Sequence, residues 1–221
     1  MTAARLASAL LALSCVTACE AREAAPGDAP PVVELGEPVD DPGTAGGGLV
    51  GDSGMLPAPV GQLPADYAFV DEKGAERTFG ELRGKFVVLD FIFTACSGPC
   101  PPMAEAMGRL QERIRDADDV VIRSITVDPR RDTPEVLADY AEAVGAVDGT
   151  WGFARMPIGF VNTLTRDEFL VGDGGNPLAH TTKFLLLDRE GRVRAHYDPL
   201  SDRGWIDKFL ADLAKLRAEA P

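Results

Sequence analysis

The chain has 221 residues, of which 45% are hydrophobic, and its formal net charge is -13 at pH 7. An apolar fraction of this size is ordinary for a globular protein. An acidic surface of this kind repels phosphate backbones, which argues against nucleic acid as a partner.

Residues 1–18 are predicted to be a lipoprotein signal peptide. Arg5 gives a sparse positive region, and the apolar stretch 6–16 is too short to span a bilayer. Small residues then precede Cys19, an arrangement that resembles the lipobox of bacterial lipoproteins, in which this cysteine is acylated; Cys15 fits that pattern less well. The alternative is an export signal that happens to contain two cysteines. We expect a lipid anchor at Cys19 and a location on the extracytoplasmic, periplasmic side of a bacterial membrane.

Residues 19–60 are dense in proline, glycine, alanine and acidic residues, and no apolar periodicity in them could build a core. They are predicted to form a disordered tether, kept extended by repulsion between its carboxylates. The remainder, 61–221, is about 160 residues long, which is enough for one folded domain with a single core.

The first half of this domain shows the pattern of a strand, a helix and a second strand. A short strand is predicted at 67–70, followed by a turn. The run 86–93 is apolar on both alternating faces except at Asp90, which is typical of a central strand covered on both sides. Apolar residues at helical spacing then predict a helix over 101–115, and the next strand is expected at 120–127.

The second half adds a helix, a hairpin and a closing helix. Thr133 is a favourable N-cap and Pro134 a favourable first residue for a helix that extends to about 144. A hairpin is expected from 183–188 and 193–197, and an amphipathic helix closes the chain. This order of elements predicts an α/β, thioredoxin-like fold, with a central mixed sheet flanked by helices.

Two cysteines stand directly after the predicted central strand, in the sequence Cys96-Ser97-Gly98-Pro99-Cys100. Unpaired backbone N–H groups and the helix dipole at such a position favour thiolate. Cysteines four residues apart on a helical turn can bind one ion or, after modest rearrangement, form a disulfide. Thiolates are soft ligands that favour Cu(I), with zinc as the usual competitor. The alternative is a disulfide that only stabilises the fold.

The two histidines are predicted to have different roles. His180 lies in a loop just before the strand at 183–188, where a thioredoxin-like chain returns beside the first helix, so it is the candidate imidazole ligand. His196 lies late in the hairpin and is expected to be a surface or core residue.

Several other polar or sulfur-containing side chains have ordinary structural interpretations. The helical spacing of Met103 and Met107 predicts core packing. Asp90 is interpreted as a hydrogen-bonded structural aspartate, with a raised pKa and thiol proton transfer as the alternative. Asp128 and Asp132 are explained by turn and capping geometry, in a loop that is expected to lie near the site.

With these residues in place, the domain resembles the Sco/SenC family of copper-binding assembly factors. The similarity rests on segments in the expected order across nearly the whole domain: 82–85, 90–94, the two cysteines with Pro101, 127–134 and 180–184. The resemblance implies one copper ion, as Cu(I) or Cu(II), bound by Cys96, Cys100 and His180. It also implies assembly of the CuA centre of cytochrome c oxidase, with the CuA-bearing subunit as partner.

The sequence departs from the family pattern at two places and leaves rival functions open. Ser97-Gly98 stands where many members have Pro-Asp, and Ala179 stands where an acidic residue often precedes the histidine. One rival is a thiol-disulfide oxidoreductase that reduces the target's cysteines. However, Thr181-Thr182 occupies the position where thioredoxin has a cis-proline, which favours a metal site. A peroxide-reducing relative is a weaker rival, because such enzymes place threonine and cysteine at a different spacing.

Overall fold

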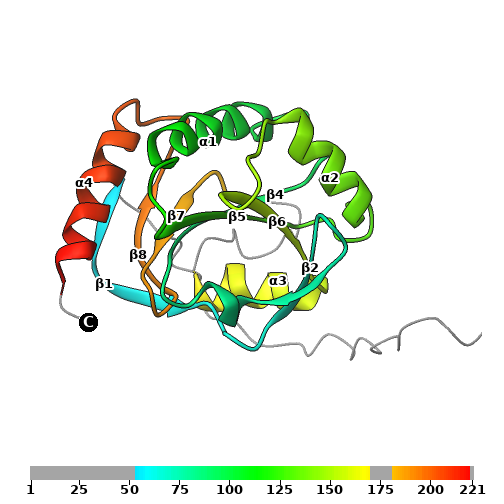
Figure 1. The fold of residues 1–221 in the computed structure, drawn as a ribbon, viewed down its shortest axis with the longest axis horizontal. Coiled ribbons are helices and arrows are strands. Elements are labelled where there is room, and N and C mark those ends of the chain that lie inside the picture. Colours follow the sequence, from blue (N-terminus) through cyan, green and yellow to red (C-terminus); the bar gives the residue numbers. More distant parts are fainter. Residues whose placement is uncertain (1–52, 170–180, 220–221) are drawn as a thin grey trace, which may run out of the picture. The chain divides into compact units, whose positions relative to one another are not determined.

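The computed structural model describes residues 53–169 and 181–219. In this part of the chain an eight-stranded mixed sheet has the order β1-β8-β7-β4-β5-β6-β2-β3 (Figure 1). The strands are β1 (Gly54–Gln62), β2 (Ala68–Asp71), β3 (Glu76–Thr78), β4 (Phe86–Ile92), β5 (Val120–Thr126), β6 (Trp151–Arg155), β7 (Phe184–Leu187) and β8 (Arg192–Tyr197). The helices are α1 (Cys100–Ile114), α2 (Pro134–Ala143), α3 (Ile158–Thr163) and α4 (Trp205–Ala218), with a 3-10 turn η1 (Phe79–Leu82) and a π-helical turn η2 (Leu164–Glu168).

Strand β4 lies at the centre of the sheet, and every one of its residues is buried. It pairs in parallel with β5, from Phe86 opposite Val120 to Ile92 opposite Thr126. On its other side it pairs antiparallel with β7. The prediction of a central strand covered on both faces is therefore confirmed.

Alternate side chains of β4 enter two separate cores. Phe86 and Val88 belong to a cluster formed with α1, α2 and α4, whereas Val87 and Leu89 belong to a cluster formed with η1, α3 and η2. Figure 1 shows α1 and α2 on one side of the sheet and α3 on the other. A strand with side chains of period two needs this cover on both faces to bury an uninterrupted apolar run.

The predicted helices are confirmed, and their ends follow local sequence signals. The Thr133 side chain accepts a hydrogen bond from the Val136 backbone N–H at 3.4 Å, and Pro134 is the first helical residue of α2. Helix α4 buries Trp205 and Phe209 against the sheet. The hairpin β7–β8 is also present, as predicted.

The folded domain begins earlier than the expected residue 61. Strand β1 starts at Gly54, inside the segment assigned to the tether, and its first residue pairs with His196 of β8. Edge pairing uses backbone groups and needs no regular apolar alternation, so the glycine- and proline-containing sequence did not indicate it. Strands β3 and β6 and helix α3 were also not predicted. Among the described residues, none of the helices is long and apolar enough to cross a membrane.

Candidate metal centre

The two domain cysteines lie where the central strand passes into the first helix. Cys100 is the first residue of α1 and is 2% exposed, whereas Cys96 lies in the preceding loop and is partly exposed. Neither cysteine is part of a disulfide, and their side chains are hydrogen-bonded to each other. The structure thus brings together two sulfur atoms, one of them open to an approaching molecule.

Burial controls the protonation of Cys100. Loss of hydration, followed by the hydrogen bond with the Cys96 side chain, raises the pKa of Cys100 to about 12, against a smaller opposing effect of the Phe93 backbone. The sequence-based expectation of a readily ionised thiol at the helix N-terminus is therefore wrong for Cys100. The helix begins at this residue, but the thiol there is buried, and burial disfavours its charged form.

Asp90 lies on β4 and is 1% exposed. Its carboxylate accepts a hydrogen bond from Ser124 Oγ at 2.6 Å, and Ser124 Oγ accepts one from Trp151 Nε1 at 2.9 Å. Burial raises the pKa of Asp90 to about 7, although the Ser124 hydrogen bond acts in the opposite direction. Asp90 is therefore hydrogen-bonded, as predicted, and it also has the raised pKa that was considered only as the alternative.

Asp132 has a different position from the one that capping geometry suggested. It is fully buried, and its carboxylate accepts hydrogen bonds from the Thr94 backbone N–H (3.2 Å), Thr94 Oγ1 (2.5 Å) and Thr126 Oγ1 (2.5 Å). The turn interpretation holds for Asp128, whose carbonyl accepts from the backbone N–H groups of Arg131 and Asp132. Sequence reasoning missed the partners of Asp132. The available signal was that Thr94 and Thr126 each stand near the carboxyl end of neighbouring parallel strands.

The candidate third ligand, His180, lies outside the described residues, as does the candidate lipid-bearing Cys19. Within the described ranges no group of three or more His, Cys, Asp or Glu side chains could hold a metal ion. Of the three predicted ligands, the structure therefore describes the two cysteines. Two adjacent sulfur donors are a set that soft ions such as Cu(I), and also zinc, prefer.

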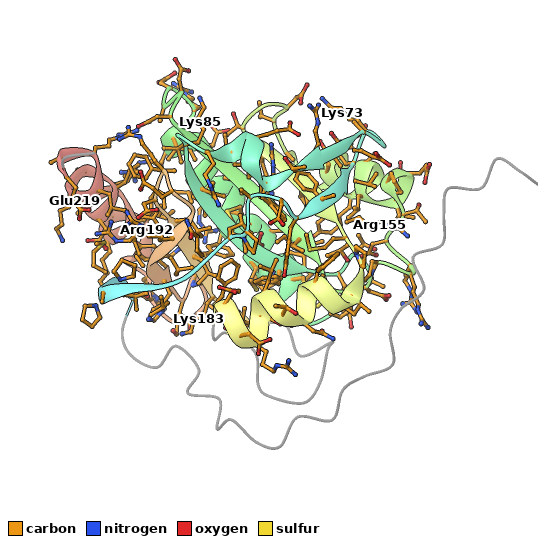
Figure 2. All side chains as sticks on the ribbon, turned by 90° about the horizontal axis from the view of Figure 1, so that it is seen from below. Lys73, Lys85, Arg155, Lys183, Arg192 and Glu219 are labelled. Carbon is orange, nitrogen blue, oxygen red and sulfur yellow. The ribbon has the colours of Figure 1, made fainter. Side chains whose placement is uncertain are left out.

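The chain enters the sheet at β7, next to β4, the strand that precedes the cysteine loop. Val87 of β4 lies opposite Leu187 of β7, and Leu89 lies opposite Leu185, so the first residues of β7 and the last residues of β4 share one edge. Lys183, labelled in Figure 2, lies just before this strand. Its ammonium pairs with the Asp198 carboxylate at 3.0 Å.

His196 behaves as a core residue, one of the two roles predicted for it. It is 2% exposed, and burial lowers its pKa. Its Nδ1 is the one buried side-chain nitrogen or oxygen without a hydrogen-bond partner in the described part of the chain. Met103 and Met107 are fully buried in the core cluster, as predicted.

A groove of about 490 Å³ opens beside Cys96, between α1 and α2. Pro101, Ala104 and Gly108 of α1 line one wall, and Tyr140 is among the residues of the other. Cys96 is therefore the sulfur that a partner can reach from the surface.

The domain is similar to known proteins both in sequence and in structure. A family model described as SCO1/SenC matches residues 57–216. A SCO1/SenC family lipoprotein from Bacillus anthracis is 28% identical, with a TM-score of 0.64 over 74% of this chain and 99% of that one.

Two further solved structures share the fold. BsSco, described as a member of the Sco family of cytochrome c oxidase assembly proteins with a disulfide switch, is 23% identical, with a TM-score of 0.64 over 76% of this chain and 99% of that one. ScoI from Bradyrhizobium japonicum with copper bound is 24% identical, with a TM-score of 0.54 over 74% of this chain and 100% of that one. The expected thioredoxin-like fold is confirmed by this agreement.

Proposed function

The chain belongs to the SCO1/SenC family, and on this basis we propose that it is a copper-binding metallochaperone that assists assembly of the CuA centre of cytochrome c oxidase. The observation that carries the proposal is the pair of mutually hydrogen-bonded cysteines, not joined by a disulfide, that follows the central strand. A solved relative holds copper, and another is described as an oxidase assembly protein.

The proposed ligands are Cys96, Cys100 and His180. Two sulfur donors and an imidazole suit Cu(I) in a low-coordinate geometry, from which the ion can still pass to a partner. The register of β7 against β4 supports the third ligand, because the strand that follows His180 begins at the sheet edge that carries the cysteines. Copper is the cargo of this protein, and binding it requires loss of the thiol protons.

We further propose that the domain is lipid-anchored at Cys19 on the extracytoplasmic side of the membrane. A relative described as a lipoprotein supports this placement. The intended recipient is the CuA-bearing oxidase subunit. A partly exposed Cys96 next to an open groove is compatible with transfer between proteins by ligand exchange.

Copper titration of the reduced full-length chain tests the proposal. A colorimetric Cu(I) chelator in competition is expected to show one Cu(I) per chain. Cys96→Ser, Cys100→Ser and His180→Ala are each expected to weaken binding by at least tenfold. His196→Gln is the matched control for loss of an imidazole and is expected to keep the affinity within threefold, with circular dichroism used to check folding. Absence of Cu(I) binding by the wild type, or wild-type affinity in Cys96→Ser, contradicts the proposal.

A second function, thiol-disulfide exchange, is favoured by the contact between the two thiols. Cys96 and Cys100 would be oxidised to a disulfide while the disulfide of a target is reduced to two thiols, so electrons and protons balance. Reduction of an oxidised CuA-type peptide at an unchanged rate in His180→Ala would favour this function, because copper binding needs the imidazole and exchange does not.

A further inference from the structure

The buried carboxylate of Asp132 joins the loop that carries Cys96 to the end of the neighbouring strand. We propose that Asp132 is a positioning residue for the sulfur pair, which holds Cys96 in place relative to Cys100 through Thr94. The consequence of this position of Cys96 for copper binding rests on the proposed function. The positioning of Cys96 by Asp132 does not depend on it.

The contacts concentrate on one residue of the cysteine loop. Thr94 gives Asp132 both its backbone N–H (3.2 Å) and its hydroxyl (2.5 Å), so the backbone and side chain of Thr94 are fixed at the same time. Thr126 Oγ1 supplies the third hydrogen bond, from the last residue of β5. A fully buried carboxylate needs such donors to replace water, which makes this arrangement costly to open.

Thr94 lies inside the turn that presents Cys96. The Cys96 backbone N–H donates to the Phe93 carbonyl at 3.2 Å, which closes a four-residue turn with Thr94 at its second position. The two central residues of a turn set the direction in which the chain leaves it. Fixing Thr94 therefore fixes the direction of the segment that ends in the Cys96 side chain.

The other end of the arrangement is anchored in the sheet. The Asp132 backbone N–H donates to the Asp128 carbonyl at 3.0 Å, which holds the loop after β5 in a closed turn. Arg155, labelled in Figure 2, donates from Nε to the Pro129 carbonyl at 2.9 Å and ties the same loop to β6. Thr94 is thus connected, through Asp132, to a loop that is held by its own hydrogen bonds.

The two cysteines are consequently held by separate means. Cys100 is the first residue of α1 and packs in the core, so the helix fixes its position. Cys96 belongs to no helix or strand, and Asp132 orients its turn through Thr94. Loss of the Asp132 contacts should change the relation between the two sulfur atoms while the core on both faces of the sheet stays intact.

The test measures the sulfur pair without metal, in the full-length chain. Oxidised glutathione converts the two thiols to one disulfide and yields two molecules of reduced glutathione. The equilibrium constant is obtained by mass spectrometry of the tryptic fragment 86–109, which contains both cysteines. Thr94→Val removes one hydroxyl donor at constant shape, and Thr94→Ser retains it. Thr126→Val is the control, because it removes a hydroxyl donor from the same carboxylate, together with the acceptor of the Asp128 N–H, but leaves the hydrogen bonds of the Cys96 turn in place.

The expected result is a change of more than threefold in the equilibrium constant for Thr94→Val and Asp132→Asn. Thr94→Ser and Thr126→Val should stay within threefold of the wild type, although urea unfolding should show that both valine variants are less stable. In copper-loaded protein, the thiolate absorption band should shift in Thr94→Val and not in Thr126→Val. A change of threefold or less in Thr94→Val, or an equal change in Thr126→Val, overturns the proposal. The glutathione measurement is independent of copper, so it remains interpretable if the copper titration fails.

Discussion

Replacement of Asp90 by asparagine should make the protein more stable at alkaline pH. Asp90 is 1% exposed on the central strand, and its carboxylate accepts a hydrogen bond from the Ser124 hydroxyl. Burial disfavours the ionised carboxylate and raises its pKa from 3.8 to about 7. Asparagine has nearly the same shape, can accept the Ser124 hydrogen bond through its carbonyl oxygen, and carries no charge at any pH.

The raised pKa sets both the sign and the size of the effect. The folded state holds its proton up to about pH 7, whereas the unfolded chain releases it near 3.8, so stability falls as the pH rises through this window. At about 1.36 kcal/mol for each pKa unit, the whole penalty is about 4 kcal/mol. More than half of it, about 2–3 kcal/mol, falls between pH 5 and pH 8. Asp90→Asn should lack this loss.

Urea unfolding of reduced, metal-free protein at pH 5 and pH 8 measures the difference. The comparison of variant with wild type removes the contributions of the other titrating groups, which both proteins share. Asp139→Asn on the exposed surface of α2 is the matched control, and it should reproduce the wild-type pH dependence. The reasoning is refuted if wild type and Asp90→Asn lose the same free energy of unfolding between the two pH values.

Two further predictions concern the first residue of α1 and the N-cap of α2. In native reduced protein at pH 8, iodoacetamide should modify Cys96 and leave Cys100 unmodified until urea is added. The reason is that burial raises the pKa of Cys100 and excludes the reagent. Equal modification of the two cysteines, measured by peptide mass spectrometry, would contradict this prediction. Thr133→Ala should lower the free energy of unfolding by about 1 kcal/mol, because the Val136 N–H loses its acceptor, whereas Thr133→Ser should retain most of that stability in the same urea assay.

The sequence predicts well those features that depend on neighbours in the chain. An uninterrupted apolar run can be satisfied only by cover on both faces, and this placed β4 correctly at the centre of the sheet. The Thr133-Pro134 pair satisfies the start of a helix locally, and α2 begins there. The two cysteines follow β4 directly, so their place at the strand-to-helix junction also came from local order.

The sequence analysis missed features that depend on partners distant along the chain. Asp132 is 38 residues from Thr94, and nothing in its local sequence distinguishes a buried carboxylate with three donors from an exposed turn residue. Strand β1 depends on β8, which lies more than a hundred residues away. The role of His180 stays a prediction, because His180 lies outside the described residues.

Two opposing effects act on the pKa of Cys100: the helix N-terminus lowers it, and burial raises it. A helix N-terminus stabilises a nearby negative charge by about 0.3–1 kcal/mol at exposed positions, which is less than about one pKa unit. Burial and the contact with Cys96 raise the pKa of Cys100 from 9.0 to about 12, so they outweigh any help from the helix. The sulfur at this helix end is also removed from water, and desolvation has the larger effect. A helix N-terminus therefore does not by itself predict an ionised thiol where the side chain is buried, as it is at Cys100.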